Sequence, residues 1–298
     1  MLAHIFPGQG SQTPGMGQEV YEFSFVAKSK FEKANDILGF RLSDIMFRGT
    51  AEELKETRVT QPAIFIHSVA LAMFMSEEHK PDMMAGHSLG EFSALVASKA
   101  ISLDSGIRLV NLRAQAMHRA CQDSDGTMAA VLKLDDKTVE DVCNQVGGIV
   151  VPANYNSPGQ LVISGERNAV EKAAELLKEA GGRAIILNVA GAFHSELMKP
   201  AYEELAEAIK NTDFDEPFCP VYQNVTASAT TDPKKLQQNL IDHILSPVKW
   251  VETVNNMIAD GAKEFQEIGP GKILQGLVRK IDPSVEVDSI STIPKPEE

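Results

Sequence analysis

Basic residues are scarce in this chain of 298 residues, which has 28 Lys and Arg against 41 Asp and Glu and a formal charge of −13. Contacts to nucleic-acid phosphates need a basic face. The acidic balance therefore argues against nucleic acid as a general partner, although it leaves room for a local basic patch. Arg279 and Lys280 are candidates for such a patch, and solvated helix positions are the simpler interpretation of both.

Cysteine is almost absent: the chain has only Cys121, Cys143 and Cys219, far apart, and no C-x-x-C. An odd, scattered set fits neither a disulfide framework nor a zinc site, and is typical of free thiols in a reducing cytoplasm. The sequence also lacks the zinc-binding pattern H-E-x-x-H. We therefore expect a cytoplasmic protein with no metal and no bound cofactor.

Long apolar runs are missing too. The most apolar stretch, Ala63 to Met75, contains His67 and Ser68 and is followed by charged residues. It is too short and too polar for a membrane span, so we interpret it as a buried helix and expect no membrane partner. The first residues, Met1 to Pro7, lack a basic stretch followed by an apolar one, and predict a strand instead of a secretory signal.

What the chain does have is an alternation of strand-like and helical segments, which favours an α/β architecture. Its length and its 43% of apolar residues suffice for a buried core. The predicted strands outside the middle of the chain are Leu2–Phe6, Pro81–Ala85, Val221–Asn224 and Glu264–Ile268. The predicted helices are Phe23–Leu38, an apolar one opening at Gln61, Leu103–Ala120 after an N-cap at Ser102, Glu196–Lys210, Lys234–Leu245 and Ile273–Ile281. Proline and glutamate in the tail, Ile293 to Glu298, predict a frayed end.

The order of the predicted strands and helices changes near Gly126. The order there is β-α-β-β-α-β, a split βαβ arrangement that forms a compact sandwich by itself. Its predicted elements are strands Met128–Leu134, Ile149–Ala153, Gln160–Ser164 and Arg183–Val189, helices Asp136–Gln145 and Glu166–Ala180, and a turn at Asn156–Gly159. We therefore expect an inserted small domain over residues 125–192, and a core formed by residues 1–124 and 193–298.

The most informative motif is Gly86-His87-Ser88-Leu89-Gly90, a G-x-S-x-G pattern between a predicted strand and a predicted helix. A serine on such a sharp turn is held clear of the backbone, with its Oγ at the positive end of the helix. The flanking glycines leave room for a substrate and for tight packing of helix on strand. Ser88 is thus a candidate nucleophile. The alternative is an ordinary turn with a capping serine.

A serine nucleophile needs a base. Of the seven histidines, His194 stands out because it follows the last predicted strand of the inserted domain in a loop of small residues, and clefts form at such junctions. His243 is the second candidate. The other histidines suit other roles. His4 lies in a predicted strand, His79 and His118 lie near helix ends, His67 lies inside the apolar helix, and His87 is next to Ser88.

An attack on a carbonyl also needs donors for the oxyanion, and backbone N–H groups serve well. The N–H of Leu89, just after the serine, is a natural donor. The second is expected from the loop Pro7–Gln12, with Gln9 as the candidate. A phosphate cradle is the competing interpretation of this loop, but it lacks both the Lys-Ser of a P-loop and any G-x-G-x-x-G.

Arg113 and Met117 lie four residues apart in a predicted helix and so share one face. A guanidinium there could clamp a substrate carboxylate while the thioether lines a pocket. A surface charge and a core filler are the alternatives, and spacing alone does not separate them.

Taken together, ordered motifs along nearly the whole chain resemble the malonyl-CoA:acyl-carrier-protein transacylases of bacterial fatty-acid synthesis. The motifs are Phe6–Gln12, Gly86–Glu91, Leu112-Arg113, Asn154–Gln160, Phe193–Ser195, Ser246–Trp250 and Glu267–Gly271. The resemblance implies a hydrolase-like α/β core that carries a ferredoxin-like subdomain, with the active site in the cleft between them.

Carried over motif by motif, the resemblance assigns Ser88 as nucleophile and His194 as base. It makes Gln9 and Leu89 the oxyanion donors and Arg113 the ligand of the malonyl carboxylate. The remaining substrate-binding positions that it implies are Met117, Phe193 and Asn156. In having a bulky residue at Phe193, this sequence is similar to malonyl-selective members, and the side chain should crowd an α-methyl branch.

His243 stands where many family members have glutamine, and the resemblance implies that the backbone carbonyl of this residue orients the catalytic histidine. A carbonyl survives a change of side chain, so we expect the dyad to persist. Whether the imidazole adds a pH-sensitive group is a separate question.

The implied reaction is ping-pong: malonyl passes from malonyl-CoA, a substrate and not a cofactor, to Ser88 and then to the phosphopantetheine thiol of an acidic acyl carrier protein. We expect a monomer. A stand-alone acyltransferase or proofreading acyl hydrolase of a polyketide synthase, a general esterase, and a catalytically quiet binding domain are the alternatives. We prefer the transferase because generic ester hydrolysis gives Arg113 no role.

Overall fold

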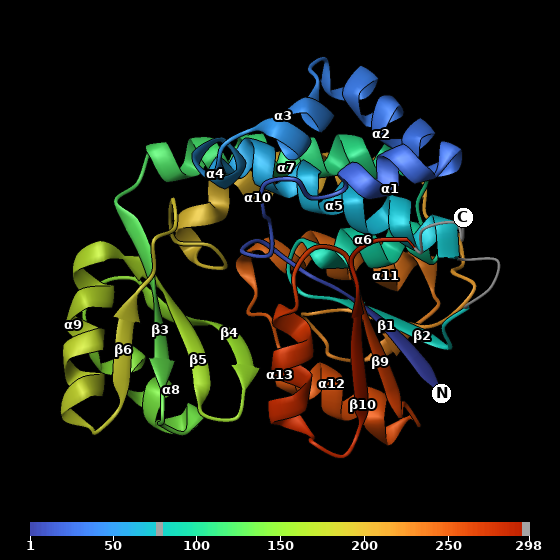
Figure 1. Cartoon of the computed structure of the whole chain (residues 1–298). Coiled ribbons are helices and arrows are strands. Elements are labelled where there is room, and N and C mark those ends of the chain that lie inside the picture. Colours follow the sequence, from blue (N-terminus) through green and yellow to red (C-terminus); the bar gives the residue numbers. More distant parts are fainter. Residues whose placement is uncertain (76–79, 294–298) are drawn as a thin grey trace.

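The computed structural model describes residues 1–75 and 80–293. The predicted frayed tail lies outside these residues except for Ile293, and His79 lies outside them as well. Two lobes stand side by side: a large one, and a small one built on β3 to β6 (Figure 1). The fold is α/β with two sheets.

The large lobe is built on a six-stranded sheet in the order β10-β9-β1-β2-β7-β8. The strands are β1 (Leu2–Phe6), β2 (Met83–Gly86), β7 (Val221–Tyr222), β8 (Ala229–Thr230), β9 (Glu264–Ile268) and β10 (Glu286–Ile290). All neighbours are parallel except β7 and β8. A parallel sheet collects the carboxyl ends of its strands at one edge, and loops at that edge commonly form binding sites.

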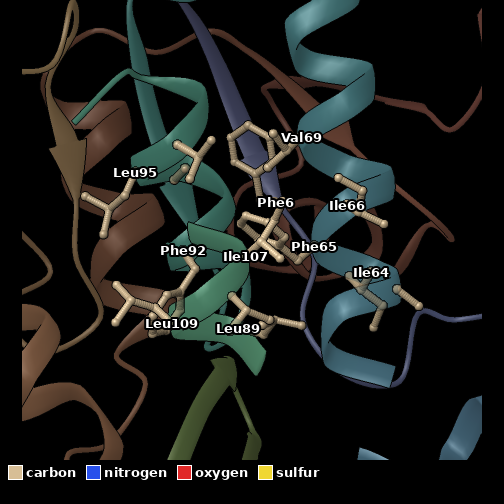
Figure 2. Packing of buried hydrophobic residues seen from close by; sticks show 14 of the residues in the cluster. Phe6, Ile64, Phe65, Ile66, Val69, Leu89, Phe92, Leu95, Ile107 and Leu109 are labelled. Carbon is tan, nitrogen blue, oxygen red and sulfur yellow. The ribbon is translucent and has the colours of Figure 1, made fainter. Parts of the chain in front are cut away.

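Alternation along the strands divides the core into two layers. Ala3 and Ile5 of β1 pack in one apolar cluster with α12 (Trp250–Ala259) and α13 (Ile273–Ile281). Phe6 points to the opposite face and joins the cluster formed with α5 (Thr57–Met75), α6 (Gly90–Ala97) and α7 (Leu103–Gln122). Figure 2 shows residues of this second layer, among them Phe6 of β1, Phe65 of α5 and Leu89 just before α6. Helices thus cover both faces, as a parallel sheet requires.

Among the described residues, α5 is the one helix long and apolar enough by composition to cross a membrane. Its side chains are largely buried within the protein, which agrees with the interpretation as a core helix. The helix begins at Thr57 and not at Gln61. Pro62 lies inside the helix, where it removes one i→i−4 hydrogen bond, so the helix forms across the proline because its side chains are buried in the core.

Several helices of the large lobe frame this core. They are α1 (Gln18–Phe23), α2 (Phe25–Leu38), α3 (Leu42–Arg48), α4 (Ala51–Lys55), α10 (Lys199–Lys210) and α11 (Pro233–Asp242), with short 3₁₀ turns η1 (Glu196–Met198) and η2 (His243–Leu245). The prediction of one helix from Phe23 was wrong at its start. Ser24 is extended and its Oγ accepts a hydrogen bond from the N–H of Ala27, so it caps α2 and separates it from α1.

The small lobe is an antiparallel sheet in the order β4-β5-β3-β6, the ferredoxin-like arrangement. Its elements are β3 (Gly126–Leu132), α8 (Asp136–Gln145), β4 (Val150–Ser157), β5 (Gln160–Glu166), α9 (Arg167–Glu179) and β6 (Arg183–Ile186). Its own apolar core joins α8 and α9 to the sheet. The turn predicted at Asn156–Gly159 was too long, because Asn156 and Ser157 continue β4 through an irregular pairing with β5.

Backbone hydrogen bonds join the two lobes. The N–H of Tyr155 in β4 donates to the carbonyl of Val248 at 2.9 Å, and the N–H of Val248 donates to the carbonyl of Ala153 at 2.8 Å. This bridge fixes β4 beside the segment that leads into α12. Side chains of both lobes can therefore meet at the end of the large sheet.

Candidate active site

The turn Gly86–Gly90, called here the serine turn, joins β2 to α6. Close contacts with neighbouring backbone atoms require glycine at both of its ends. A Cβ on Gly86 would lie 1.9 Å from the backbone carbon of Gly90, and a Cβ on Gly90 would lie 2.0 Å from the carbonyl oxygen of Phe6. Ser88 has a φ of 51°, a left-handed conformation that residues other than glycine seldom adopt. The sequence therefore folds into a strained turn that presents one serine.

His194 faces that serine. Its Nε2 lies 2.9 Å from Ser88 Oγ, within hydrogen-bonding distance. His194 also has a positive φ, of 59°, in the loop that leaves the small lobe. The structure thus brings together the two residues that sequence reasoning selected, one from each side of the junction between the lobes.

The other ring nitrogen of His194 faces backbone carbonyls. Nδ1 lies 2.9 Å from the carbonyl oxygen of Ser246 and 3.3 Å from that of His243. A carbonyl oxygen only accepts, so Nδ1 carries the proton and Nε2 is free to accept one from Ser88. The sequence prediction named His243 alone. The shorter contact comes from Ser246, because the chain turns back after η2 and presents both carbonyls to the ring.

Burial and the neighbouring guanidinium of Arg113 keep His194 neutral. Desolvation, Arg113 and His87 lower the pKa of His194 to about 3. His243 is fully buried beside it, with ring centroids 5.4 Å apart, and burial likewise lowers the pKa of His243 well below its usual value. The site therefore holds a neutral imidazole as a proton acceptor over a wide pH range.

Arg113 of α7 is buried, which excludes the interpretation as a surface charge. Its Nη2 donates to Ser88 Oγ at 3.1 Å, and its Nη1 donates to Gln61 Oε1 at 2.6 Å. Its guanidinium carbon lies 5.7 Å from the centre of the Phe92 ring. Burial lowers the pKa of Arg113 to about 10, so the side chain remains a cation at neutral pH.

A cavity of about 130 Å³ lies at this point, between the two lobes. Its lining includes the predicted residues Gln9, Ser88, Leu89, Arg113, Met117, Phe193 and His194, together with His87, Met128, Asn154, Leu187 and Val189. Asn156, predicted to bind substrate, is not in this lining. It accepts a hydrogen bond from His87 Nε2 at 2.8 Å, and Asn154 is the asparagine of β4 that reaches the cavity.

The comparison with known families decides the class of this site. Residues 3–295 match the acyl transferase domain family. The chain belongs to that family.

Curated relatives extend over nearly the whole of this acyltransferase. A malonyl CoA-acyl carrier protein transacylase of Bacillus subtilis is 44% identical, with 97% of this chain and 93% of the relative covered. The Escherichia coli K12 protein of the same name is 40% identical, with 94% and 92% covered.

Solved structures agree with the fold of the acyltransferase. An acyl carrier protein S-malonyltransferase from Vibrio cholerae matches with a TM-score of 0.94 at 41% identity, covering 99% of this chain and 98% of that one. A malonyl-transacylase solved in complex with a type II polyketide acyl-carrier protein matches with a TM-score of 0.94 at 38% identity, covering 98% and 96%.

Three residues of the acyltransferase site escaped sequence reasoning. Gln61 holds Arg113, Ser246 supplies the shorter carbonyl contact, and Asn224 contacts the serine turn. Gln61 was visible as a polar residue at the start of an apolar helix. Asn224 was visible as a polar residue at the end of a strand, but nothing in the sequence indicated that this strand lies beside β2.

Proposed function

We propose that this acyltransferase moves a malonyl group from malonyl-CoA to the phosphopantetheine thiol of an acyl carrier protein through a malonyl-Ser88 intermediate. The observation that carries the proposal is that one oxygen, Ser88 Oγ, lies 2.9 Å from a neutral imidazole nitrogen and 3.1 Å from a buried guanidinium nitrogen. A base and a fixed cation at the same hydroxyl suit a substrate with a thioester at one end and a carboxylate at the other.

In the first half-reaction, Ser88 Oγ attacks the thioester carbonyl as its proton passes to His194 Nε2. The N–H groups of Gln9 and Leu89 hold the oxyanion, at the positive end of α6. Collapse of the tetrahedral intermediate breaks the carbon–sulfur bond, and His194 returns the proton to the leaving thiolate. Malonyl is then an ester on Ser88.

In the second half-reaction, the phosphopantetheine thiol takes the place that coenzyme A left. His194 accepts the thiol proton, the sulfur attacks the ester carbonyl, and the proton passes to Ser88 Oγ as the carbon–oxygen bond breaks. The two half-reactions use the same groups in opposite order, which is the reason for ping-pong kinetics.

Arg113 selects the acyl group. Gln61 takes Nη1, so the edge formed by Nε and Nη2 is left for a carboxylate, and this edge matches carboxylate geometry. A substrate that ends in methyl leaves the buried cation unpaired, a loss of about 2–4 kcal/mol. Phe193 lines the same cavity, and its bulk should crowd an α-methyl branch.

The chemistry needs only side chains, backbone donors and two thiols, so we propose that no cofactor or metal takes part. We place the reaction in the cytoplasm, where the free Cys121, Cys143 and Cys219 remain reduced, and in fatty-acid synthesis. The monomeric state stays a prediction.

Intact-protein mass spectrometry with malonyl-CoA tests the proposal. The wild type gains one malonyl group and loses it when the phosphopantetheinylated carrier protein is added, whereas Ser88→Ala gains none. Ser93→Ala is the matched control, because Ser93 is a buried serine of α6 that does not line the cavity. Full malonylation of Ser88→Ala would rule out this nucleophile.

The same experiment separates the alternatives. A hydrolase releases malonate steadily from malonyl-CoA without carrier protein, whereas a transferase stops after one acylation. A binding domain shows no covalent mass increase. Parallel reactions with fatty-acid and polyketide carrier proteins identify the pathway, since the favoured pathway predicts faster discharge by the first.

A further inference from the structure

The side chain of Asn224 spans the serine turn. Its Oδ1 accepts a hydrogen bond from the N–H of Ser88 at 2.7 Å, and its Nδ2 donates to the carbonyl of Gly86 at 2.6 Å. One amide therefore satisfies the backbone on both sides of His87. Asn224 is fully buried, and it is not in the lining of the cavity.

This contact continues the sheet beyond the ends of its strands. β2 and β7 pair in parallel up to Ala85 and Tyr222. Past that point the chain of the serine turn bends away from β7, and the side chain of Asn224 takes the place of the missing peptide group. The strained φ of Ser88 has to be maintained by its surroundings, and this amide bonds the backbone N–H of the strained residue itself.

Asn224 is held in turn by a buried carboxylate. Glu91, in the first turn of α6, accepts hydrogen bonds from the N–H of Asn224 at 2.8 Å and from Gln223 Nε2 at 3.0 Å. Gln223 also donates to the carbonyl of Leu236 at 3.0 Å and accepts from Asn239 Nδ2 at 2.9 Å. Leu236 and Asn239 belong to α11.

The network therefore reaches the segment that orients the base. α11 runs directly into η2, and His243 and Ser246 in and after η2 provide the carbonyls that face His194 Nδ1. One stretch of chain, residues 223–246, thus contacts both the backbone of the nucleophile and the ring of the base.

We propose that Asn224 is a positioning residue, which fixes the backbone of Ser88 so that Oγ stays aligned with His194, and that Glu91 and Gln223 fix Asn224. The proposal rests on Ser88 being the nucleophile of the proposed function. A small misplacement of a reacting group costs up to about a hundredfold in rate. Loss of the amide should therefore slow acylation without weakening the binding of malonyl-CoA.

Asn224→Ala is the primary variant, and Asn256→Ala is its control. Asn256 Nδ2 donates to the carbonyl of Ala227 at 2.9 Å, so the control loses a similar amide bond to the same loop without touching the serine turn. Two rates are measured: acylation of Ser88 by malonyl-CoA in a single turnover, and phosphonylation of Ser88 by a fluorophosphonate, which needs no malonyl recognition. Both are expressed per folded molecule, with the folded fraction taken from circular dichroism well below the melting temperature.

For Asn224→Ala we expect both rates to fall by about ten- to a hundredfold, with the half-saturating malonyl-CoA concentration within about twofold of wild type. Asn256→Ala keeps both rates. Asn224→Asp retains the acceptor for Ser88 and loses the donor to Gly86, and should fall between the two.

Rates per folded molecule within twofold of wild type in Asn224→Ala would overturn the proposal, and so would an equal loss in Asn256→Ala. If malonyl-CoA acylates no variant while the fluorophosphonate labels the wild type, the substrate assignment fails, and the labelling rates still decide the role of Asn224.

Discussion

At the scale of single residues, Arg113 determines which acyl group is accepted. The guanidinium is buried, held by Gln61, and directed at Ser88 Oγ. A buried cation favours a substrate that brings a negative charge to it and disfavours one that does not.

Arg113→Ala should lower the rate of malonyl transfer by about a hundredfold, because the charge-assisted pair contributes about 2–4 kcal/mol. Acetyl transfer should hold or rise, since the variant no longer buries an unpaired cation. The two rates are measured on the same enzyme preparations with malonyl-CoA and acetyl-CoA. Equal losses on both substrates would remove the role of carboxylate ligand.

The pH profile is a second property of one residue. His194 is deprotonated in the folded protein down to about pH 3, since burial and the adjacent cation Arg113 lower its pKa. A base with a lowered pKa loses activity only when the pH falls through that lower value. The rate of Ser88 acylation should therefore stay flat from pH 8 to about pH 5, measured by quenched flow, instead of falling near pH 6.5. A midpoint near 6.5 would contradict a desolvated base.

At the scale of elements, the serine turn depends on how closely α6 approaches β1 and β2. Gly90→Ala would place a methyl group 2.0 Å from the Phe6 carbonyl, which no rotamer change relieves. We expect a loss of at least about 3 kcal/mol in the free energy of unfolding, and loss of acylation. Gly276→Ala in α13 is the control, with nothing within 4 Å of the new methyl group, and it should stabilise the protein by up to about 1 kcal/mol. Urea unfolding of both variants checks the pair, and a stable, active Gly90→Ala enzyme would refute the packing argument.

Elements with strong periodicity were predictable from the sequence, and short ones were not. β1, α7 and α8 were expected within a few residues of their observed bounds. β10 and α12 were not predicted, although Asp260-Gly261 follows α12 and Asp282-Pro283 precedes β10. β10 is a short edge strand that depends on its pairing with β9.

The site divides in the same way. The serine motif and the junction loop made Ser88 and His194 candidates, and the family resemblance selected Arg113, which spacing alone had left open; the structure brings the three together. The carbonyl of Ser246 and the amide of Asn224 act through geometry that only strand order and chain reversal create.

At the scale of the whole molecule, buried histidines link stability to pH. Burial lowers the pKa of His67 to about 4, and it also lowers those of His87, His194 and His243. The unfolded chain binds protons at these groups near pH 6.5 while the folded protein does not, so stability falls as the pH drops below 6.5. Buried Glu91, whose pKa is raised to about 7, acts in the opposite sense but is outnumbered.

The free energy of unfolding in urea should therefore be lower at pH 5 than at pH 7. His67→Gln should reduce this difference, because it removes one such group from α5 at a residue that does not line the active-site cavity. His118→Gln in α7 is the control variant. An unchanged difference in His67→Gln would show that His67 does not contribute to the link.

The two carbonyls behind His194 have a consequence for the direction of the exchange. A carboxylate in their place would make the imidazole a stronger base, whereas two neutral carbonyl dipoles leave it a weak base. A weak base is a strong acid once it is protonated, so His194 readily returns its proton to the departing thiolate in the first half-reaction and to Ser88 Oγ in the second. Both half-reactions are therefore easily reversed, and the direction of net exchange follows from which of the two thiols is in excess.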